Sequence, residues 1–228
     1  SLFELICPDF ITSAPDYPWY QQIDTQMIDH HPESIAISRN VLKRAISEKG
    51  MAFTGIRSKC LEVEYFNRMV KSVKNKATVS FTAIASLIQS AIDVFDPKDG
   101  TLQIIVDRQG GRVAYREPLQ KMFDPEDLKI LRQDEKCSSY EFVQQGKHIK
   151  IHFTVKADDK YLPVALASMA SKYIRELLMI SLNKYFTDRF PELKPTAGYY
   201  TDGMRFLEDL EPHLVNMDFN REKLVRIR

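Results

Sequence analysis

The feature that most constrains the fold is a strand pattern that leads, through two adjacent aspartates, into a long helix pattern. Residues 148–155 (HIKIHFTV) alternate apolar and polar side chains, which is typical of a strand with one buried face. The helix is predicted to open at Leu162–Pro163, because proline suits a first helical turn. Asp158 and Asp159 lie between the two patterns. The stretch therefore predicts an α/β fold with an acidic pair at a strand–helix junction.

The charged residues around this junction allow two interpretations. Lys156 and Lys160 flank the acidic pair, and small side chains crowd the first turns of the predicted helix. Two carboxylates beside two lysines would suit a metal ion and a phosphate. Equally, the helix dipole favours acidic residues at any helix N-terminus, and no ligand is then required.

A second predicted strand ends in a carboxylate. Residues 102–107 (LQIIVD) form a continuous apolar run, which predicts a strand buried on both faces of a sheet. In open α/β sheets functional groups gather at the carboxyl ends of strands, which is where Asp107 falls. The glycine turn that follows, RQGGR, matches no nucleotide-binding loop. Residues 113–147 show no functional motif. They predict a short helix, two strands and a hairpin turn at Gln145–Gly146.

The amino-terminal part of the chain predicts irregular structure and two helices. Residues 1–33 contain four prolines and are predicted to be irregular. Residues 34–50 predict an amphipathic helix that ends at a glycine. An extended segment over 52–67 then leads into one long helix near 66–95, basic in its first half and apolar in its second. The basic half is either a solvated face or a surface that contacts phosphate.

Composition narrows the class of protein. The 228 residues are 44% hydrophobic with only 8 glycines, which suits one globular domain or one domain with an appendage. A net charge of +1 gives no global basic field, so any surface for nucleic acid must be local. Three widely spaced cysteines form no disulfide framework, which predicts a reducing, cytoplasmic setting. No apolar run approaches the ~18 residues of a membrane span, and we expect a monomer without membrane association.

Three segments resemble catalytic blocks of ribonuclease HII-type enzymes, in the order in which that family carries them. They are Ile105-Val106-Asp107 with Gly110, Gly111 and Arg112; Lys156 and Asp158 with Ser168, Lys172 and Arg175; and Gly198-Tyr199-x-Thr201. The pair of glycines in the first segment departs from the family pattern. The match covers roughly residues 52–205 and is similar to a divergent bacterial branch of the family.

The resemblance implies a fold and an organisation. The expected fold is ribonuclease H-like, a mixed five-stranded sheet with helices on both faces and a helical C-terminal extension. The implied parts are an irregular and helical segment over 1–50, the ribonuclease H-like core over 51–188, and an extension over 189–228 that contacts substrate.

The resemblance also implies an activity, which is hydrolysis of the RNA strand in RNA/DNA duplexes or at ribonucleotides embedded in DNA. Such a site needs several carboxylates around two divalent ions, and hard oxygen ligands select Mg²⁺ or Mn²⁺. The implied metal ligands are Asp107 and Asp158, which are also the implied catalytic residues, with Asp159 as a substitute or supporting carboxylate. The implied substrate-binding residues are Lys156 and Lys172, which would orient carboxylates or contact phosphate, Arg112, Ser168, Tyr199 against the sugar, and Thr201, which would also cap the next helix.

One block of the family is missing. The family's first block, Asp-Glu-x-Gly on the central strand, has no counterpart in residues 1–60. Either the sequence is part of a longer protein, which we expect because the fold needs that strand, or this member has lost the motif. Three functions therefore stay open: a ribonuclease HII-like endonuclease, a nucleic-acid-binding module that kept the fold and lost the metal site, and a scaffold protein without a nucleic-acid role.

Overall fold

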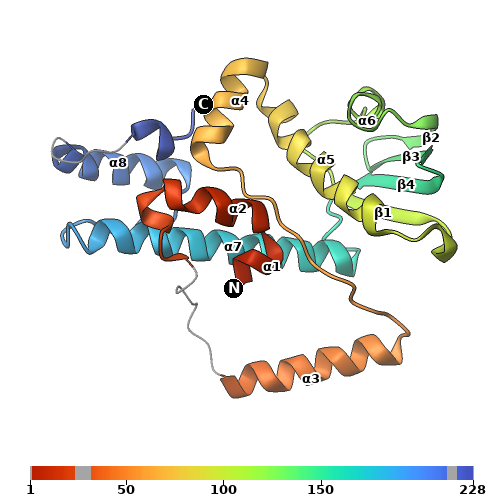
Figure 1. Ribbon diagram of the computed structural model, residues 1–228, viewed down its shortest axis with the longest axis horizontal. Coiled ribbons are helices and arrows are strands. Elements are labelled where there is room, and N and C mark those ends of the chain that lie inside the picture. The colour runs from red at the N-terminus through yellow and green to blue at the C-terminus, as the bar shows by residue number, and fades with distance from the viewer. Residues whose placement is uncertain (1, 24–31, 215–219, 228) are drawn as a thin grey trace. The chain divides into compact units, whose positions relative to one another are not determined.

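The chain folds into two compact units, each with its own buried side chains. The computed structural model (Figure 1) describes residues 2–23, 32–214 and 220–227. Residues 1–58 and 173–219 form one unit, called here the helical unit, and residues 59–172 and 220–228 form the other, the sheet unit. The division falls inside the long helix α7 (Leu162–Thr187). The predicted division at residues 50 and 188 stays a prediction.

The sheet unit contains a four-stranded mixed sheet, so the expected α/β class is confirmed. Its strands are β1 (Leu102–Asp107), β2 (Glu126–Gln133), β3 (Cys137–Gln144) and β4 (Lys147–Thr154), in the order β1-β4-β3-β2. β1 runs parallel to β4, whereas β4–β3 and β3–β2 are antiparallel. Gln145 and Gly146 both have positive φ (52° and 72°), the conformation of a tight hairpin turn, which confirms the predicted turn between β3 and β4.

Two expectations about this sheet are wrong for the described residues. The resemblance implied five strands, and four are present. β1 was expected to be buried on both faces, but Gln103 and Asp107 are exposed and its apolar side chains are only partly buried. The reason is its place in the sheet: β1 is an edge strand with β4 on one side only. Strand order is a tertiary property that a local apolar run does not report.

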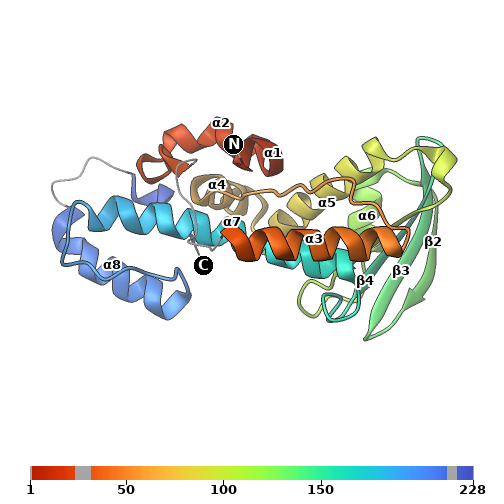
Figure 2. The same cartoon turned by 90° about the horizontal axis from the view of Figure 1, so that it is seen from below.

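Two helices of the sheet unit, α5 (Lys76–Val94) and α6 (Arg116–Phe123), pack on one face of the sheet (Figure 2). They share a core with the inward side chains of β3 and β4. The core consists of Phe81, Ala85, Ile88, Ile92, Tyr115, Leu119, Phe123, Tyr140, Phe142, Ile149, Ile151 and Phe153. The opposite face carries polar side chains of the same strands, including Ser139, Glu141, Lys150 and His152. In the described core, helices therefore cover one face of the sheet. The resemblance implied helices on both faces, and the second set is not found in this core.

The single helix predicted near 66–95 is wrong, because the chain breaks there into two helices. α4 (Val63–Val73) ends where Lys74 adopts a left-handed conformation (φ 54°). Asn75 then caps α5, and its Oδ1 accepts a hydrogen bond from the backbone N–H of Thr78 at 3.1 Å. The predicted extended segment correspondingly ends at Glu62.

The carboxyl-terminal residues of the described chain are fixed on α4. The buried Asn67 donates from Nδ2 to the carbonyls of Glu222 (3.1 Å) and Val225 (2.8 Å), and its Oδ1 accepts from the N–H of Ile227 at 2.8 Å. The guanidinium of Arg226 lies 3.5 Å from the centroid of the Phe66 ring. Residues 220–227 are thus part of the sheet unit.

The helical unit contains short amino-terminal helices, α3 (Pro32–Glu48), the later part of α7 and α8 (Tyr200–Leu214). α1 (Leu2–Ile6), α2 (Pro8–Ser13), and the 3₁₀ turns η1 (Ala14–Asp16) and η2 (Pro18–Tyr20) replace the irregular structure predicted for most of 1–33; residues 24–31 lie outside the described residues. The buried Trp19 stacks on Phe186 of α7, with ring centroids 5.9 Å apart. Phe186 meets Phe206 of α8 at 5.6 Å. These rings are part of the buried core of the unit.

The predicted amphipathic helix is present as α3 (Pro32–Glu48), but its apolar stripe is not buried by the described residues. Ile35, Ile37, Val41 and Leu42 are all exposed. The helix therefore gains little from burial within this chain, although its residues have adequate helix propensity.

One described helix, α5, is long and apolar enough to cross a membrane by length and composition, which the sequence pattern did not predict. This is weak evidence for a span, because a core helix of a globular protein passes the same test. The inner side of α5 packs on the sheet through Phe81, Ala85, Ile88 and Ile92.

Candidate active site

The candidate active site lies where the parallel strands β1 and β4 end side by side. In the register of the two strands Asp107 is opposite Thr154, and the N–H of Arg108 donates to the Thr154 carbonyl at 3.0 Å. The exposed Asp107 side chain turns toward the chain that leaves β4, and its Oδ1 accepts from the N–H of Ala157 at 2.9 Å. Asp107 thus lies directly beside the segment 156–159.

The turn after β4 directs both of its carboxylates outward. Ala157 is fully buried, and its carbonyl accepts from the N–H groups of Lys160 (3.1 Å) and Tyr161 (2.9 Å). Asp158 and Asp159 follow this anchor and are exposed. Their side-chain oxygens make no protein hydrogen bond among the described residues, so their lone pairs are available to water, to an ion or to a substrate.

Lys156 occupies an unusual backbone conformation at the start of this turn. Its φ is 51°, in the left-handed region that costs a non-glycine residue roughly 1–2 kcal/mol. Lys74 shares that conformation, so the backbone alone does not single Lys156 out. The side chain is exposed, as expected for a lysine that could contact a phosphate.

The loop between β1 and α6 is held by two arginines. Arg108 donates from its guanidinium to the carbonyls of Asp134 (2.6 Å) and Glu135 and to Ser138 Oγ (3.2 Å), which fixes the loop against the β2–β3 turn. Arg112 lies 5.7 Å from the ring centroids of both Phe81 and Tyr115. Its guanidinium is therefore oriented by aromatic rings rather than by a carboxylate.

Tyr115 closes the inner side of this loop. Its hydroxyl accepts from the N–H of Gln109 at 3.1 Å, and its own N–H donates to the hydroxyl of Tyr140 at 2.8 Å. Burial raises the pKa of Tyr115 above its ordinary value of 10.0. The ring stays neutral at physiological pH, so Tyr115 supports the loop and is no candidate acid or base.

The structure does not assemble a complete metal site from the predicted ligands. Across residues 2–23, 32–214 and 220–227, no three His, Cys, Asp or Glu side chains converge in a way that could hold an ion. Asp107 is held beside the Asp158–Asp159 segment, but one of its oxygens already accepts from Ala157. A two-ion site needs several converging carboxylates, and these three do not supply it as placed.

Ser168 and Lys172 lie on the part of α7 that belongs to the sheet unit. They are four residues apart and so share one side of the helix; Ser168 is partly buried and Lys172 exposed. In the described part of the chain no hydrogen bond or ion pair joins either side chain to Asp107 or Asp158. The structure therefore leaves their predicted roles untested.

Tyr199, the predicted sugar contact, and Thr201 belong to the helical unit. Tyr199 ends the loop 194–199 and is exposed, and its ring lies 4.5 Å from the guanidinium of Arg175. α8 begins at Tyr200, so Thr201 lies inside its first turn instead of capping it. Asp202 bonds to the preceding loop in its place.

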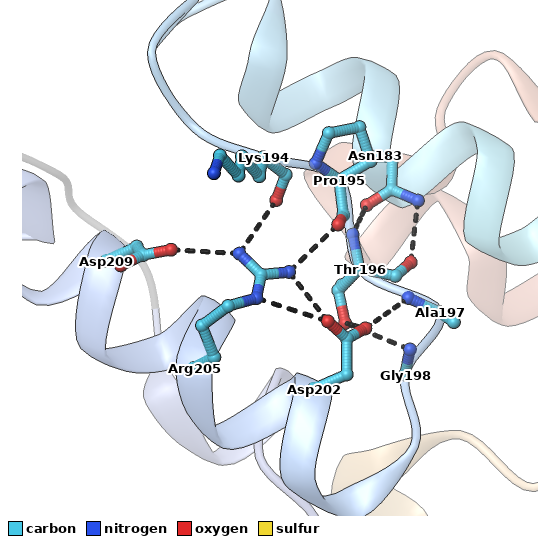
Figure 3. Close-up of polar contacts among 9 residues, drawn as sticks. All are labelled: Asn183, Lys194, Pro195, Thr196, Ala197, Gly198, Asp202, Arg205 and Asp209. Atoms are coloured by element: carbon cyan, nitrogen blue, oxygen red, sulfur yellow. Dashed lines mark hydrogen bonds and ion pairs between the residues drawn. The ribbon is translucent and has the colours of Figure 1, made fainter.

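Asp202 and Arg205 connect the first turn of α8 to this loop (Figure 3). Asp202 Oδ2 accepts from Thr196 Oγ1 (2.7 Å) and from the N–H of Ala197 (2.6 Å). Arg205 donates to Asp202 Oδ1 (2.8 Å) and to the carbonyl of Pro195 (2.9 Å). These bonds, with that from Arg205 the largest, lower the pKa of Asp202 to about 2.

Sequence reasoning missed this network. A signal was present, because Asp202, Arg205 and Asp209 are spaced by three and four residues, the spacing of ion pairs on one helix side. Asn183 is also part of the network and carried no local signal, since its partner Thr196 is thirteen residues away.

The chain was compared with protein-family models, with curated proteins and with solved structures, and none of them matches it.

Proposed function

We propose that the chain carries part of the active site of a ribonuclease HII-like endonuclease, which hydrolyses the RNA strand of RNA/DNA duplexes with Mg²⁺ or Mn²⁺. The observation that carries this proposal is the 2.9 Å hydrogen bond between Asp107 Oδ1 and the N–H of Ala157. It places the carboxylate that ends β1 beside the carboxylate-bearing segment that follows the parallel strand β4. Two of the three segments that resemble catalytic blocks therefore meet at the carboxyl-terminal ends of two neighbouring parallel strands.

The proposal includes a ribonuclease H-like fold for the sheet unit. β1 has a free edge, because β4 is its only partner among the described strands. An additional strand that paired there would lie next to Asp107, and carboxylates on it would be added where the described site has too few; it would be an outer strand, unlike the central strand that carries the family's first block. A free strand edge offers unpaired backbone groups to such a partner.

In this proposal, different residues of the chain contact the ions, the phosphates and the sugar. Divalent ions, when bound, would activate water and stabilise the leaving oxygen, but the described carboxylates alone do not fit a complete site for them. Lys156, Lys172 and Arg112 would contact phosphates, which give affinity without reading sequence. Tyr199 would pack against a sugar, and RNA is distinguished from DNA by the 2′-hydroxyl of that sugar.

The incomplete carboxylate set favours a second candidate function. A nucleic-acid-binding module with the same phosphate and sugar contacts would need no third carboxylate. Its charged residues would be Lys156, Lys172 and Arg112, and Asp107 would serve only as the acceptor for the Ala157 N–H. This candidate predicts binding without turnover.

Cleavage of labelled duplexes tests the proposal. The substrates are a long RNA/DNA hybrid and a DNA duplex with one ribonucleotide, each incubated in Mg²⁺ and in Mn²⁺. The decisive variant is Asp107→Asn, because its amide oxygen can still accept from Ala157 while the charge of the ion ligand is lost. Asp188→Asn is the matched control, since it removes a carboxylate whose partner is Lys184 on the surface of α7.

The outcomes separate the candidates. For an enzyme we expect cleavage by the wild type and by Asp188→Asn, and a loss of about 10²–10⁴-fold in Asp107→Asn. Binding of both duplexes without cleavage supports the module, and Asp107→Asn should then bind equally well or better, because a negative charge near phosphate is removed. Absence of binding at low salt, where phosphate contacts are strongest, contradicts both candidates.

A further inference from the structure

Two tyrosines are presented to solvent at the start of α8. Tyr199 is 67% exposed and Tyr200 is 62% exposed. The Arg175 guanidinium lies 4.5 Å from the Tyr199 ring centroid and also donates from Nη2 to the carbonyl of Ala197. An exposed aromatic ring beside a fixed cation is a surface on which a flat or ring-shaped ligand can stack.

The loop that carries Tyr199 is held by side chains from two helices. Asn183 of α7 donates from Nδ2 to the carbonyl of Thr196 and accepts at Oδ1 from the N–H of Thr196, both at 2.8 Å. Thr196 Oγ1 donates to Asp202 at 2.7 Å and accepts from the N–H of Gly198 at 3.0 Å. Figure 3 shows that these bonds and those of Arg205 converge on the loop 194–198.

The loop favours glycine at position 198 for two reasons. Its φ is +71°, a conformation that L side chains rarely adopt, and a Cβ there would lie 3.0 Å from Met179 Sδ. The loop therefore runs close over α7 immediately before Tyr199. Its path is fixed by backbone conformation and close packing as well as by hydrogen bonds.

Ordering this loop lowers its conformational entropy, and the exposed Tyr199 ring contributes little burial to offset that loss when the chain folds. Fixing the backbone of each loop residue costs roughly 1–2 kcal/mol of conformational entropy, and an exposed ring buries little apolar surface in return. Ordinary capping of α8 would need one acceptor. It would not require Arg205 to bind the carbonyl of Pro195, or Asn183 to bind both backbone groups of Thr196.

We propose that Asn183, Thr196, Asp202 and Arg205 are positioning residues, which hold Tyr199 and Arg175 as a preformed surface that stacks against a sugar at a ribonucleotide. The inference rests on the proposed function, because Tyr199 is the expected sugar contact there. It adds the residues that set the position of Tyr199. Preorganisation of this kind raises affinity, since the cost of ordering the loop is met in folding rather than in binding.

The test compares two substitutions of one side chain in the full chain. Thr196→Val keeps the size of the side chain but removes the hydroxyl, so Gly198 N–H and Asp202 each lose a partner. Thr196→Ser restores the hydroxyl. Tyr199→Ala removes the stacking ring itself, and Asp188→Asn again serves as the surface control.

Binding is measured by fluorescence anisotropy in EDTA at one fixed salt concentration, on two labelled duplexes. One is DNA with a single embedded ribonucleotide and the other is all DNA of the same sequence. The quantity compared is the ratio of the two dissociation constants, which a general loss of stability does not change. Amide hydrogen exchange of Ala197 and Gly198 reports the order of the loop without nucleic acid.

We expect Tyr199→Ala to weaken binding of the ribonucleotide duplex by about five- to hundredfold and to abolish the preference for it. Thr196→Val should lower the preference about three- to tenfold and speed exchange of the Gly198 amide about tenfold or more, because the loop loses its fixed path. Thr196→Ser and Asp188→Asn should behave as the wild type.

Three results overturn parts of this account and can be told apart. If Tyr199→Ala weakens binding but Thr196→Val keeps the full preference, the positioning inference is wrong and the sugar contact stands. If Tyr199→Ala has no effect while both duplexes bind, the sugar contact in the proposed function is wrong and the positioning residues have nothing to position. If the wild type binds neither duplex, the proposed function and the inference both fail.

Discussion

The carboxylate site of the sheet unit and the Tyr199 loop of the helical unit use their polar groups in opposite ways. Asp107 makes one hydrogen bond, to the N–H of Ala157, and the exposed Asp158 and Asp159 follow that residue. In the loop, by contrast, Thr196 is bonded through its N–H, its carbonyl and its hydroxyl. The carboxylates of the sheet unit therefore keep unused hydrogen-bond acceptors, whereas the polar groups of the loop are almost all hydrogen-bonded.

This difference indicates what each region can do. A carboxylate can bind an ion or orient a water molecule only if its lone pairs are not already occupied, so chemical capacity lies at the ends of β1 and β4. Asp202 has committed both oxygens to Arg205, Thr196 and Ala197, and it can only support structure. The loop presents a surface of fixed shape, whereas the carboxylates at the ends of β1 and β4 keep acceptor capacity for an ion or a water molecule.

The largest effect on stability should come from Asn183→Ala. The substitution leaves the N–H and carbonyl of the buried Thr196 without partners, and we expect the free energy of unfolding to fall by about 2 kcal/mol. Urea denaturation followed by circular dichroism measures the change. The neighbouring Lys184→Ala breaks only the exposed pair with Asp188 and should cost ~0–0.5 kcal/mol. Equal losses in the two variants would mean that the loop contributes nothing to stability.

Asp107 provides the matching test in the sheet unit. Asp107→Ala leaves the Ala157 N–H without its partner and should lower the free energy of unfolding by ~1 kcal/mol. Asp107→Asn should cost almost nothing, because the amide oxygen can replace the carboxylate as acceptor. Urea titrations of both variants measure the difference. If Asp107→Asn lowered the free energy of unfolding as much as Asp107→Ala, the charge of Asp107 would be needed for stability. The carboxylate site would then resemble the Tyr199 loop in using its polar groups for structure.

Local sequence signals were enough to predict the strands of the sheet unit and the hairpin between β3 and β4. The alternation over 148–155 and the dipeptide Gln145–Gly146 predict β4 and its hairpin, because side-chain period and turn conformation are local properties. Pro163 in the first turn of α7 is a further local signal. The expectation that Asp107 would lie at the carboxyl end of its strand followed from the same kind of reasoning, whereas its position beside the 156–159 segment depends on the pairing of β1 with β4.

Other parts of the chain could not be predicted, for physical reasons. Prolines in 1–33 suggested irregular structure, yet Pro8, Pro15 and Pro18 each lie in the first turn of a short helix, where proline is tolerated. The break between α4 and α5 falls at Lys74, a residue type that gives no signal for a left-handed conformation. The Asn183–Thr196 contact joins residues that no local pattern connects.

The two units should also differ in their response to acid, and Asp202 sets the response of the loop. Its pKa is lowered from 3.8 to about 2 in the folded chain, chiefly by the hydrogen bond from Arg205. The stabilisation is therefore complete above about pH 4 and is lost as the pH falls toward 2. Exchange protection of the Ala197 amide, corrected for intrinsic rates, should follow that curve. Asp202→Asn should remove the pH dependence; protection that already declined near pH 5 would contradict the assignment.

The smallest expected effect concerns His152, on the polar face of the sheet. Burial, and to a lesser extent the charge of Lys150, lowers the pKa of His152 below its ordinary value of 6.5, and its Nδ1 lies 2.9 Å from Ser139 Oγ.

The folded chain therefore binds a proton at His152 less readily than the unfolded chain, so the stability of the sheet unit should decrease as the pH falls below about 6.5. That window lies well above the window of Asp202. We expect urea midpoints measured between pH 7.5 and 5 to fall for the wild type and to change less for His152→Gln. If both proteins gave the same slope, other groups would control the acid response of the sheet, and the two units would not be separated by pH.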